Sequence, residues 1–219
     1  GPDFYTIIKN DVRKALRIFE GKLKVPNLDA SLEEAKKKII VCRSINQVKF
    51  WAEKLKEIGR DGSVLSFDIE TTGLDAYAED AKILTVQFGW RREVDGVIVS
   101  IVIPLWHREN TGYSADEAWT HLVEILTDEN IRKIGHNVKF DIIYVMRTKG
   151  VRLKGLLFDT MLMLHSIDSG QQGMYGLKRN VWNHLPESGL GGYEDKLPKL
   201  AKKKKSGEEE EDSEESEEE

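Results

Sequence analysis

Apolar residues recur along the chain at two spacings, and these spacings separate predicted strands from predicted helices. Short runs rich in β-branched residues predict strands. Apolar residues three and four positions apart predict helices. The strands are expected at residues 39–41, 64–69, 82–90, 97–104, 131–135 and 156–158. The helices are expected over 11–23, from Ser44, around 118–126, over 140–148, from Thr160 and over 175–185.

The order of these elements indicates the fold class. Three consecutive strands, at 64–69, 82–90 and 97–104, come before a region in which strands and helices alternate. The first two strands are expected to pair through the connection at 71–81. This order predicts an α/β domain with a mixed sheet and helices packed on its faces.

Breaks in the pattern indicate three segments. Residues 1–37 form an N-terminal helical extension in which the stretch 26–31 interrupts the pattern, and residues 38–198 form the core domain. Residues 199–219 run from lysines into a block of Glu, Asp and Ser. That composition buries too little apolar surface to offset the entropy of ordering, so we expect a disordered acidic tail or linker.

Charge and cysteine content restrict the cellular setting. The net charge of −5 conceals ten acids within residues 208–219, and the other 28 acidic residues face 33 basic ones. This mildly basic body permits a polyanionic partner without indicating one. The single cysteine, Cys42, has no internal disulfide partner, and no secretory or membrane-spanning segment is evident. We therefore expect an intracellular protein that is not secreted and does not enter a membrane.

Two acidic residues end the strand at 64–69. Asp68 and Glu70 are two positions apart, so strand alternation places both on one face. Carboxylates that close repel one another unless a cation neutralises them, and Mg²⁺ or Mn²⁺ prefers such hard oxygen ligands. A pair of this kind also occurs on solvated strand ends, so the pair alone does not establish a metal site.

A second polar segment crosses from a strand into a helix. Asp141 is expected in the first helical turn, where the helix dipole favours a carboxylate, and Asn137 has the residue type of an N-cap. Both have this plain structural interpretation beside a functional one. Asp159 directly precedes the helix from Thr160, and we interpret it as a helix cap.

Taken together, four segments resemble the DEDD (DnaQ-like) 3′-5′ exonuclease superfamily, and most closely the proofreading domains of family A DNA polymerases. They are 67–74 (F-D-I-E-T-T-G-L), 135–141 (G-H-N-V-K-F-D), 158–161 (F-D-T-M) and 175–178 (Y-G-L-K). The resemblance covers roughly residues 38–197. It implies an RNase H-like mixed sheet flanked by helices.

The resemblance also implies a chemistry. Asp68, Glu70 and Asp141 would be catalytic residues that bind two divalent ions, Mg²⁺ or Mn²⁺, for hydrolysis of a phosphodiester. The substrate would be a single-stranded or frayed 3′ end of DNA, cleaved to nucleoside 5′-monophosphates. The substrate-binding residues by motif position are Thr71, Leu74, Asn137 and Phe140.

The family's third motif, Tyr-x-x-x-Asp or His-x-x-x-x-Asp, is not found after the second motif, which ends at Asp141. Tyr193 is followed by Asp195, only two positions later, and neither His165 nor His184 has an acid five positions on. We interpret both histidines as ordinary helix residues. We expect the third motif, and a polymerase domain, to lie beyond residue 219 in a longer parent chain.

Two alternatives remain. A non-catalytic nucleic-acid-binding or docking module would keep the fold without the third motif. An RNase D-like exoribonuclease would share the fold and the metal scheme while acting on RNA.

Overall fold

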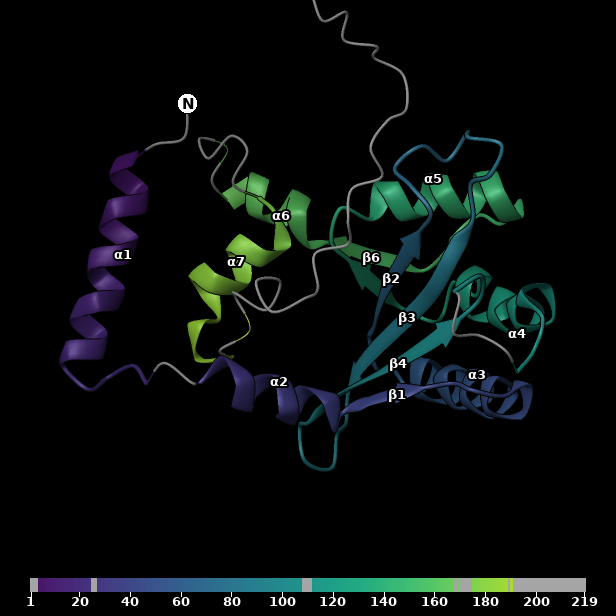
Figure 1. Ribbon diagram of the computed structural model, residues 1–219, viewed down its shortest axis with the longest axis horizontal. Coiled ribbons are helices and arrows are strands. Elements are labelled where there is room, and N and C mark those ends of the chain that lie inside the picture. The colour runs from purple at the N-terminus through teal and green to yellow at the C-terminus, as the bar shows by residue number, and fades with distance from the viewer. Residues whose placement is uncertain are drawn as a thin grey trace, which may run out of the picture.

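The computed structural model describes residues 4–24, 27–107, 112–167, 169, 175–188 and 190. One sheet with flanking helices forms the body (Figure 1). The strands are β1 (Ile39–Val41), β2 (Leu65–Thr71), β3 (Ile83–Arg91), β4 (Ile98–Pro104), β5 (Lys133–Gly135) and β6 (Leu156–Asp159). The helices are α1 (Phe4–Phe19), α2 (Leu28–Lys36), α3 (Ile45–Arg60), α4 (Ala115–Thr127), α5 (Val138–Lys149), α6 (Thr160–Ile167), α7 (Leu177–His184) and the 3-10 helix η1 (Pro186–Ser188).

The sheet has six strands in the order β1-β4-β3-β2-β5-β6. The β2, β3 and β4 strands pair antiparallel, and the β2-β3 pairing runs through the 72–82 connection as expected. The β1 strand is parallel to β4, and β5 is parallel to both β2 and β6. The prediction of a mixed α/β sheet flanked by helices is therefore confirmed.

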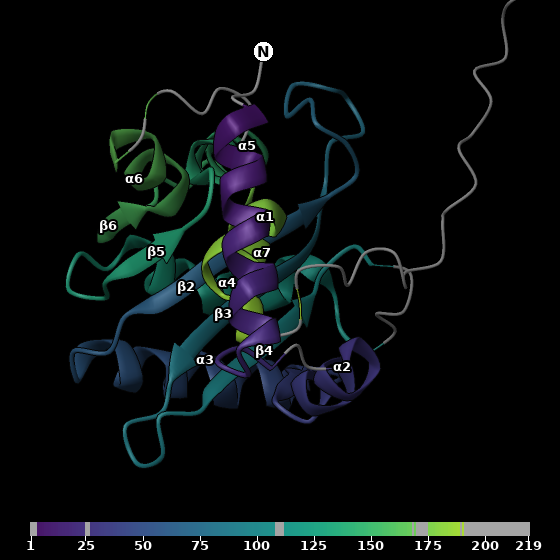
Figure 2. The same ribbon diagram turned by 90° about the vertical axis from the view of Figure 1, so that its left-hand side faces the viewer.

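The core lies where the central strands meet the helices. Alternate residues of β2, among them Phe67 and Ile69, are buried beside Val86 and Phe88 of β3. The α3 and α4 helices pack against each other, at the lower right in Figure 1, whereas α5 lies near the upper end of the sheet in both views (Figures 1 and 2). The buried face of α3 includes Val48, Ala52 and Leu55, and Trp51 is half-buried against Trp90.

The N-terminal segment differs from the predictions. The α1 helix begins at Phe4, so Asp11 lies inside the helix rather than at its start. The α2 helix occupies the stretch expected to be irregular, and Asn27 caps it by accepting a hydrogen bond from the Asp29 N–H (2.9 Å). No described residue of α2 is buried, so α2 has no buried apolar face that periodicity would reveal.

The α1 helix stands apart from the sheet, at the left in Figure 1. It reaches the body through Lys14, whose Nζ donates to the Trp182 carbonyl of α7 (2.8 Å) and lies 5.0 Å from the centre of the Trp182 ring. No helix among the described residues is long and apolar enough to cross a membrane. The acidic tail lies outside the described residues.

Candidate active site

The acidic residues of β2 lie near the middle of the sheet. Phe67 and Ile69 are buried, whereas Asp68 and Glu70, which alternate with them along β2, are exposed on the opposite face. The structure thus confirms that both acids share one face. The β2 strand ends at Thr71, whose hydroxyl donates to the Gly73 carbonyl (2.8 Å) and bends the chain away from the sheet.

Asp141 joins the two predicted motifs through a hydrogen bond. Its side chain is 2% exposed, and Oδ1 accepts from the Ile69 N–H at 3.1 Å. The β5 strand pairs with β2 only at Leu65 and Ser66, so strand pairing on that side stops before Ile69. A carboxylate from the first turn of α5 therefore supplies the acceptor that a longer β5 would have supplied.

The carboxyl groups of Asp68 and Asp141 both have raised pKa values. Burial, and then repulsion from Asp68, raise the pKa of Asp141 to about 7. Partial desolvation of the Asp68 carboxylate, and then repulsion from Glu70, raise its pKa to about 6. Because both shifts penalise the ionised form, any cation held between these groups would relieve the repulsion and favour ionisation.

The donor chemistry suits a hard divalent cation, although the side chains are not drawn into a closed cluster. Among the described residues, no three His, Cys, Asp or Glu side chains are gathered as a metal-binding group. Three carboxylates that repel one another are expected to separate until a cation neutralises them. The carboxylate oxygens of Asp68, Glu70 and Asp141 therefore suit a hard divalent cation. Binding of the ion would bring the three side chains together.

Asp159, and not Asn137, supplies the side chain that caps the N-terminus of α5. Asn137 has left-handed backbone angles (φ 57°, ψ 37°), and its side chain makes no capping hydrogen bond. Instead, Asp159 accepts from the backbone N–H groups of Asn137 and Val138, both at 2.9 Å. The interpretation of Asn137 as a side-chain cap is wrong, and its exposed side chain is left free of that task.

Asp159 also caps the helix that it precedes, as predicted. Its Oδ1 accepts from the Met161 N–H at 2.8 Å, in the first turn of α6. One buried carboxylate thus holds the N-termini of both α5 and α6. The hydrogen bond from the Asn137 N–H to Asp159 joins residues 22 positions apart, and no local sequence signal indicates it.

The predicted substrate-contacting apolar residues lie on two elements. Leu74 is 89% exposed on the 72–82 loop that leaves β2 just after Glu70. Phe140 is partly buried in the first turn of α5, with its ring centre 5.4 Å from that of Tyr144. Leu74 is therefore a surface residue and not a core position.

The Tyr144 side chain contacts the base of the loop that bears Leu74, and the sequence did not single it out. It is fully buried, and its hydroxyl lies 3.3 Å from Thr72 Oγ1 at the base of the same loop. Its helical spacing from Phe140 is the only sequence signal for it. Of the residues considered for a third motif, Tyr193 and Asp195 lie outside the described residues, whereas His165 and His184 lie exposed on α6 and α7.

Comparisons with known proteins find relatives over the same part of the chain. A family model described as 3′-5′ exonuclease matches residues 40–190. The DNA polymerase of Bacillus phage SP01 is 36% identical over 97 residues, which are 43% of this chain and 10% of that protein. The DNA polymerase I of Chloroflexus aurantiacus is 29% identical over 140 residues, which are 64% of this chain and 12% of that protein. The chain thus spans about a tenth of the length of these curated relatives.

Solved structures give weaker similarity. The complex of Trypanosoma brucei RNase D with GMP has a TM-score of 0.46 and 20% identity, covering 59% of this chain and 35% of that one. Brucella melitensis NrnC with bound Mg²⁺ has a TM-score of 0.42 and 18% identity, covering 67% and 59%.

Proposed function

The chain belongs to the 3′-5′ exonuclease family, and on that basis we propose that it shortens DNA from a single-stranded or frayed 3′ end, releasing nucleoside 5′-monophosphates. The observation that carries this proposal is the hydrogen bond from the Ile69 N–H to Asp141. It holds the α5 carboxylate against the segment of β2 that lies between Asp68 and Glu70. On this proposal, the three acids of two distant motifs would serve one reaction centre.

Asp68, Glu70 and Asp141 are proposed to bind two divalent ions, Mg²⁺ or Mn²⁺. The ions, when bound, would stabilise charge on the attacking and leaving oxygens of the phosphodiester. The raised pKa values of Asp68 and Asp141 support this role, because sites that concentrate negative charge favour cations. The hydrogen bond from Ile69 fixes one Asp141 oxygen and leaves the other for a ligand.

Four further residues are proposed to hold the terminal nucleotide. Leu74, on the loop after β2, and Phe140, in the first turn of α5, offer apolar surface suited to bases that pack without sequence preference. The Asn137 side chain, free of capping, offers an amide to the substrate. Thr71 orients the start of the loop that bears Leu74.

A polymerase domain in the same parent chain is the proposed partner. The support is that the curated relatives are a DNA polymerase and a DNA polymerase I, each much longer than this chain. A site that accepts unpaired ends would then act on mismatched primer termini, because a mismatched terminus frays more readily than a paired one. This is the proofreading role.

The test is release of nucleoside monophosphates from 3′-labelled single-stranded DNA in Mg²⁺ or Mn²⁺. The chain is compared with its Asp68→Ala/Glu70→Ala variant, and RNA of the same sequence is run in parallel. Metal-dependent release from DNA that the variant loses is the expected result. Release from RNA alone would favour an exoribonuclease, and binding of DNA without release would favour a non-catalytic module.

A further inference from the structure

The loop between β2 and β3, residues 72–82, is fixed along its length. Thr72 closes its base, since its N–H donates to the Lys82 carbonyl (3.0 Å) and its Oγ1 accepts from the Lys82 N–H (3.0 Å). Tyr144 of α5 contacts the same hydroxyl. In the middle of the loop, Ala76 is 7% exposed within the hydrophobic core. These contacts of Thr72, Tyr144 and Ala76 therefore hold the loop in one position.

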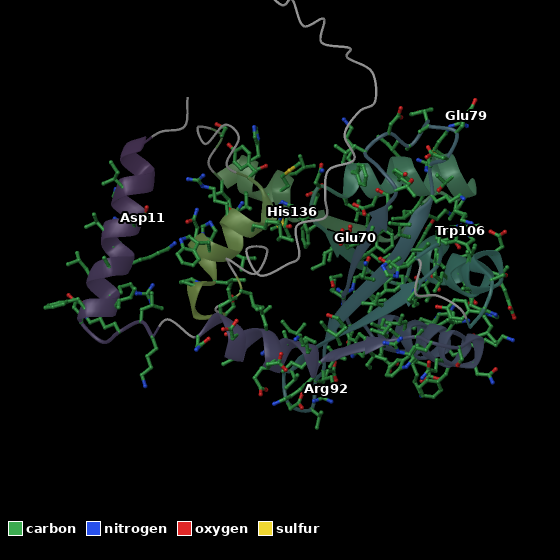
Figure 3. All side chains as sticks on the ribbon, viewed as in Figure 1. Asp11, Glu70, Glu79, Arg92, Trp106 and His136 are labelled. Atoms are coloured by element: carbon green, nitrogen blue, oxygen red, sulfur yellow. The ribbon has the colours of Figure 1, made fainter. Side chains whose placement is uncertain are left out.

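This held loop displays an aromatic ring to solvent. Tyr77 follows the buried Ala76 and is 69% exposed, and its N–H donates to Asp75 Oδ1 (2.8 Å), which fixes the turn. The guanidinium of Arg147, from α5, lies 5.1 Å from the centre of the Tyr77 ring. Figure 3 shows this loop, labelled at Glu79, rising beside the end of α5. Exposed aromatics held by a fixed backbone bind planar ligands at low entropic cost.

The positive charge of Arg147 is not neutralised by an acidic side chain among the described residues. It is exposed, and no acidic side chain in the described part of the chain lies within ion-pair distance of it. By contrast, Lys149 on the same helix is paired with Asp116 at 2.8 Å. A guanidinium stacked on a ring still presents its N–H edges, which match the geometry of a phosphate.

Arg147 lies on the same face of α5 as Phe140, which belongs to the proposed site. Phe140, Tyr144 and Arg147 follow one another at helical spacings of four and three, so they share one face of α5. Seven residues of helix place Arg147 about 10 Å along the axis from Phe140. A strand whose 3′ nucleotide lies at Phe140 would reach this distance within its next few nucleotides, at about 3.4 Å each when stacked.

We propose that Tyr77 and Arg147 form a second nucleotide subsite, at which Tyr77 stacks on a base upstream of the 3′-terminal nucleotide of single-stranded DNA and Arg147 binds a neighbouring phosphate. This rests on the proposed function, since it assigns the path of the same substrate. A stacked base contributes roughly 5- to 150-fold to affinity as judged by alanine substitution. The subsite therefore makes binding depend on strand length.

The experiment measures equilibrium binding of 5′-labelled oligothymidylates of two to eight nucleotides, and of thymidine monophosphate by competition, in Ca²⁺. The proteins are the wild type, Tyr77→Ala, Tyr77→Phe, Arg147→Met and Phe50→Ala. Phe50 is a matched control, because it is an exposed aromatic (55%) on α3, at the opposite end of the fold from α5. Thermal unfolding of each variant confirms that it folds.

The expected result is that Tyr77→Ala and Arg147→Met weaken binding of the six- to eight-nucleotide strands by at least about 5-fold, while monophosphate binding is unchanged. Tyr77→Phe and Phe50→Ala should match the wild type at every length. Equal binding of long strands by wild type and Tyr77→Ala, or an equal loss for monophosphate, overturns the subsite alone. Failure of the wild type to bind DNA of any length overturns the proposed function as well.

Discussion

The Asp141 carboxylate accepts a hydrogen bond from the Ile69 N–H at 3.1 Å, although the two residues are 72 positions apart. It lies where β5 stops pairing with β2, so it satisfies the backbone and at the same time brings the acids of two motifs together. This contact places a buried carboxyl, with its pKa raised to about 7, beside Asp68.

Asp141→Asn should stabilise the metal-free protein increasingly as the pH rises. Asparagine keeps an acceptor for the Ile69 N–H but cannot ionise. The wild-type carboxyl has an ordinary pKa near 4 when unfolded and about 7 when folded. The folded state thus binds more protons between these values, and the wild-type free energy of unfolding falls as pH rises from about 4 to 7. The advantage of the variant should grow by about 2–3 kcal/mol between pH 5 and pH 8.

Urea unfolding at several pH values in the absence of divalent metal measures this difference. Asp116→Asn is the control, because the exposed Asp116 carboxylate pairs with Lys149 and has a lowered pKa. Its folded and unfolded forms are both ionised above pH 5, so its difference from wild type should be flat. An equally flat profile for Asp141→Asn would show that the carboxyl is not destabilised by its surroundings.

Asp159→Ala should destabilise the fold by about 2–4 kcal/mol. The substitution removes the acceptor for three backbone N–H groups, on Asn137, Val138 and Met161. Ser114→Ala, which removes a single cap from α4, should cost less, at about 1 kcal/mol. The denaturant midpoints compare Asp159→Ala, which removes the caps of two helices, with Ser114→Ala, which removes the cap of one. If the two losses are equal, Asp159 contributes no more than an ordinary cap.

Lys133→Met should also destabilise the fold, by about 2–4 kcal/mol. The Lys133 side chain is fully buried, and Nζ donates to the carbonyls of Ile125 (2.7 Å) and Ile131 (2.6 Å). Methionine fills similar volume but leaves these carbonyls without that donor. Lys154→Met is the control, because Lys154 forms an exposed pair with Glu129. Similar thermal midpoints for both variants would contradict a structural role for the buried ammonium.

Leu74→Ala should raise the KM for single-stranded DNA about 5-fold or more and leave the thermal midpoint unchanged. Leu74 is 89% exposed beside the carboxylates, so its removal costs little packing within the protein. Val94→Ala is a matched control, since Val94 is 88% exposed on the connection between β3 and β4. Steady-state exonuclease kinetics measures the KM of Leu74→Ala and of Val94→Ala. Equal KM values for Leu74→Ala and wild type would remove Leu74 from the binding surface.

The sequence predicts the elements whose signals are local. The alternation of Phe67, Asp68, Ile69 and Glu70 predicts both the strand and the shared face of its acids, because a period of two is a property of the strand itself. The α2 helix lacks such a signal, since none of its described residues is buried. The hydrogen bonds of Asp141 to Ile69 and of Asp159 to Asn137 join distant segments. Local residue patterns contain no information on such contacts.

The central claim is that Asp68 and Asp141 act in one metal-dependent centre. A double-mutant cycle of Asp68→Asn, Asp141→Asn and the double variant, measured as nucleoside monophosphate release in Mn²⁺, tests it most directly. Residues that act as a unit are strongly non-additive, so each single variant should lose nearly as much activity as the double variant. If the two losses multiply independently, or if Asp141→Asn retains wild-type rates, the two carboxylates do not share a catalytic centre.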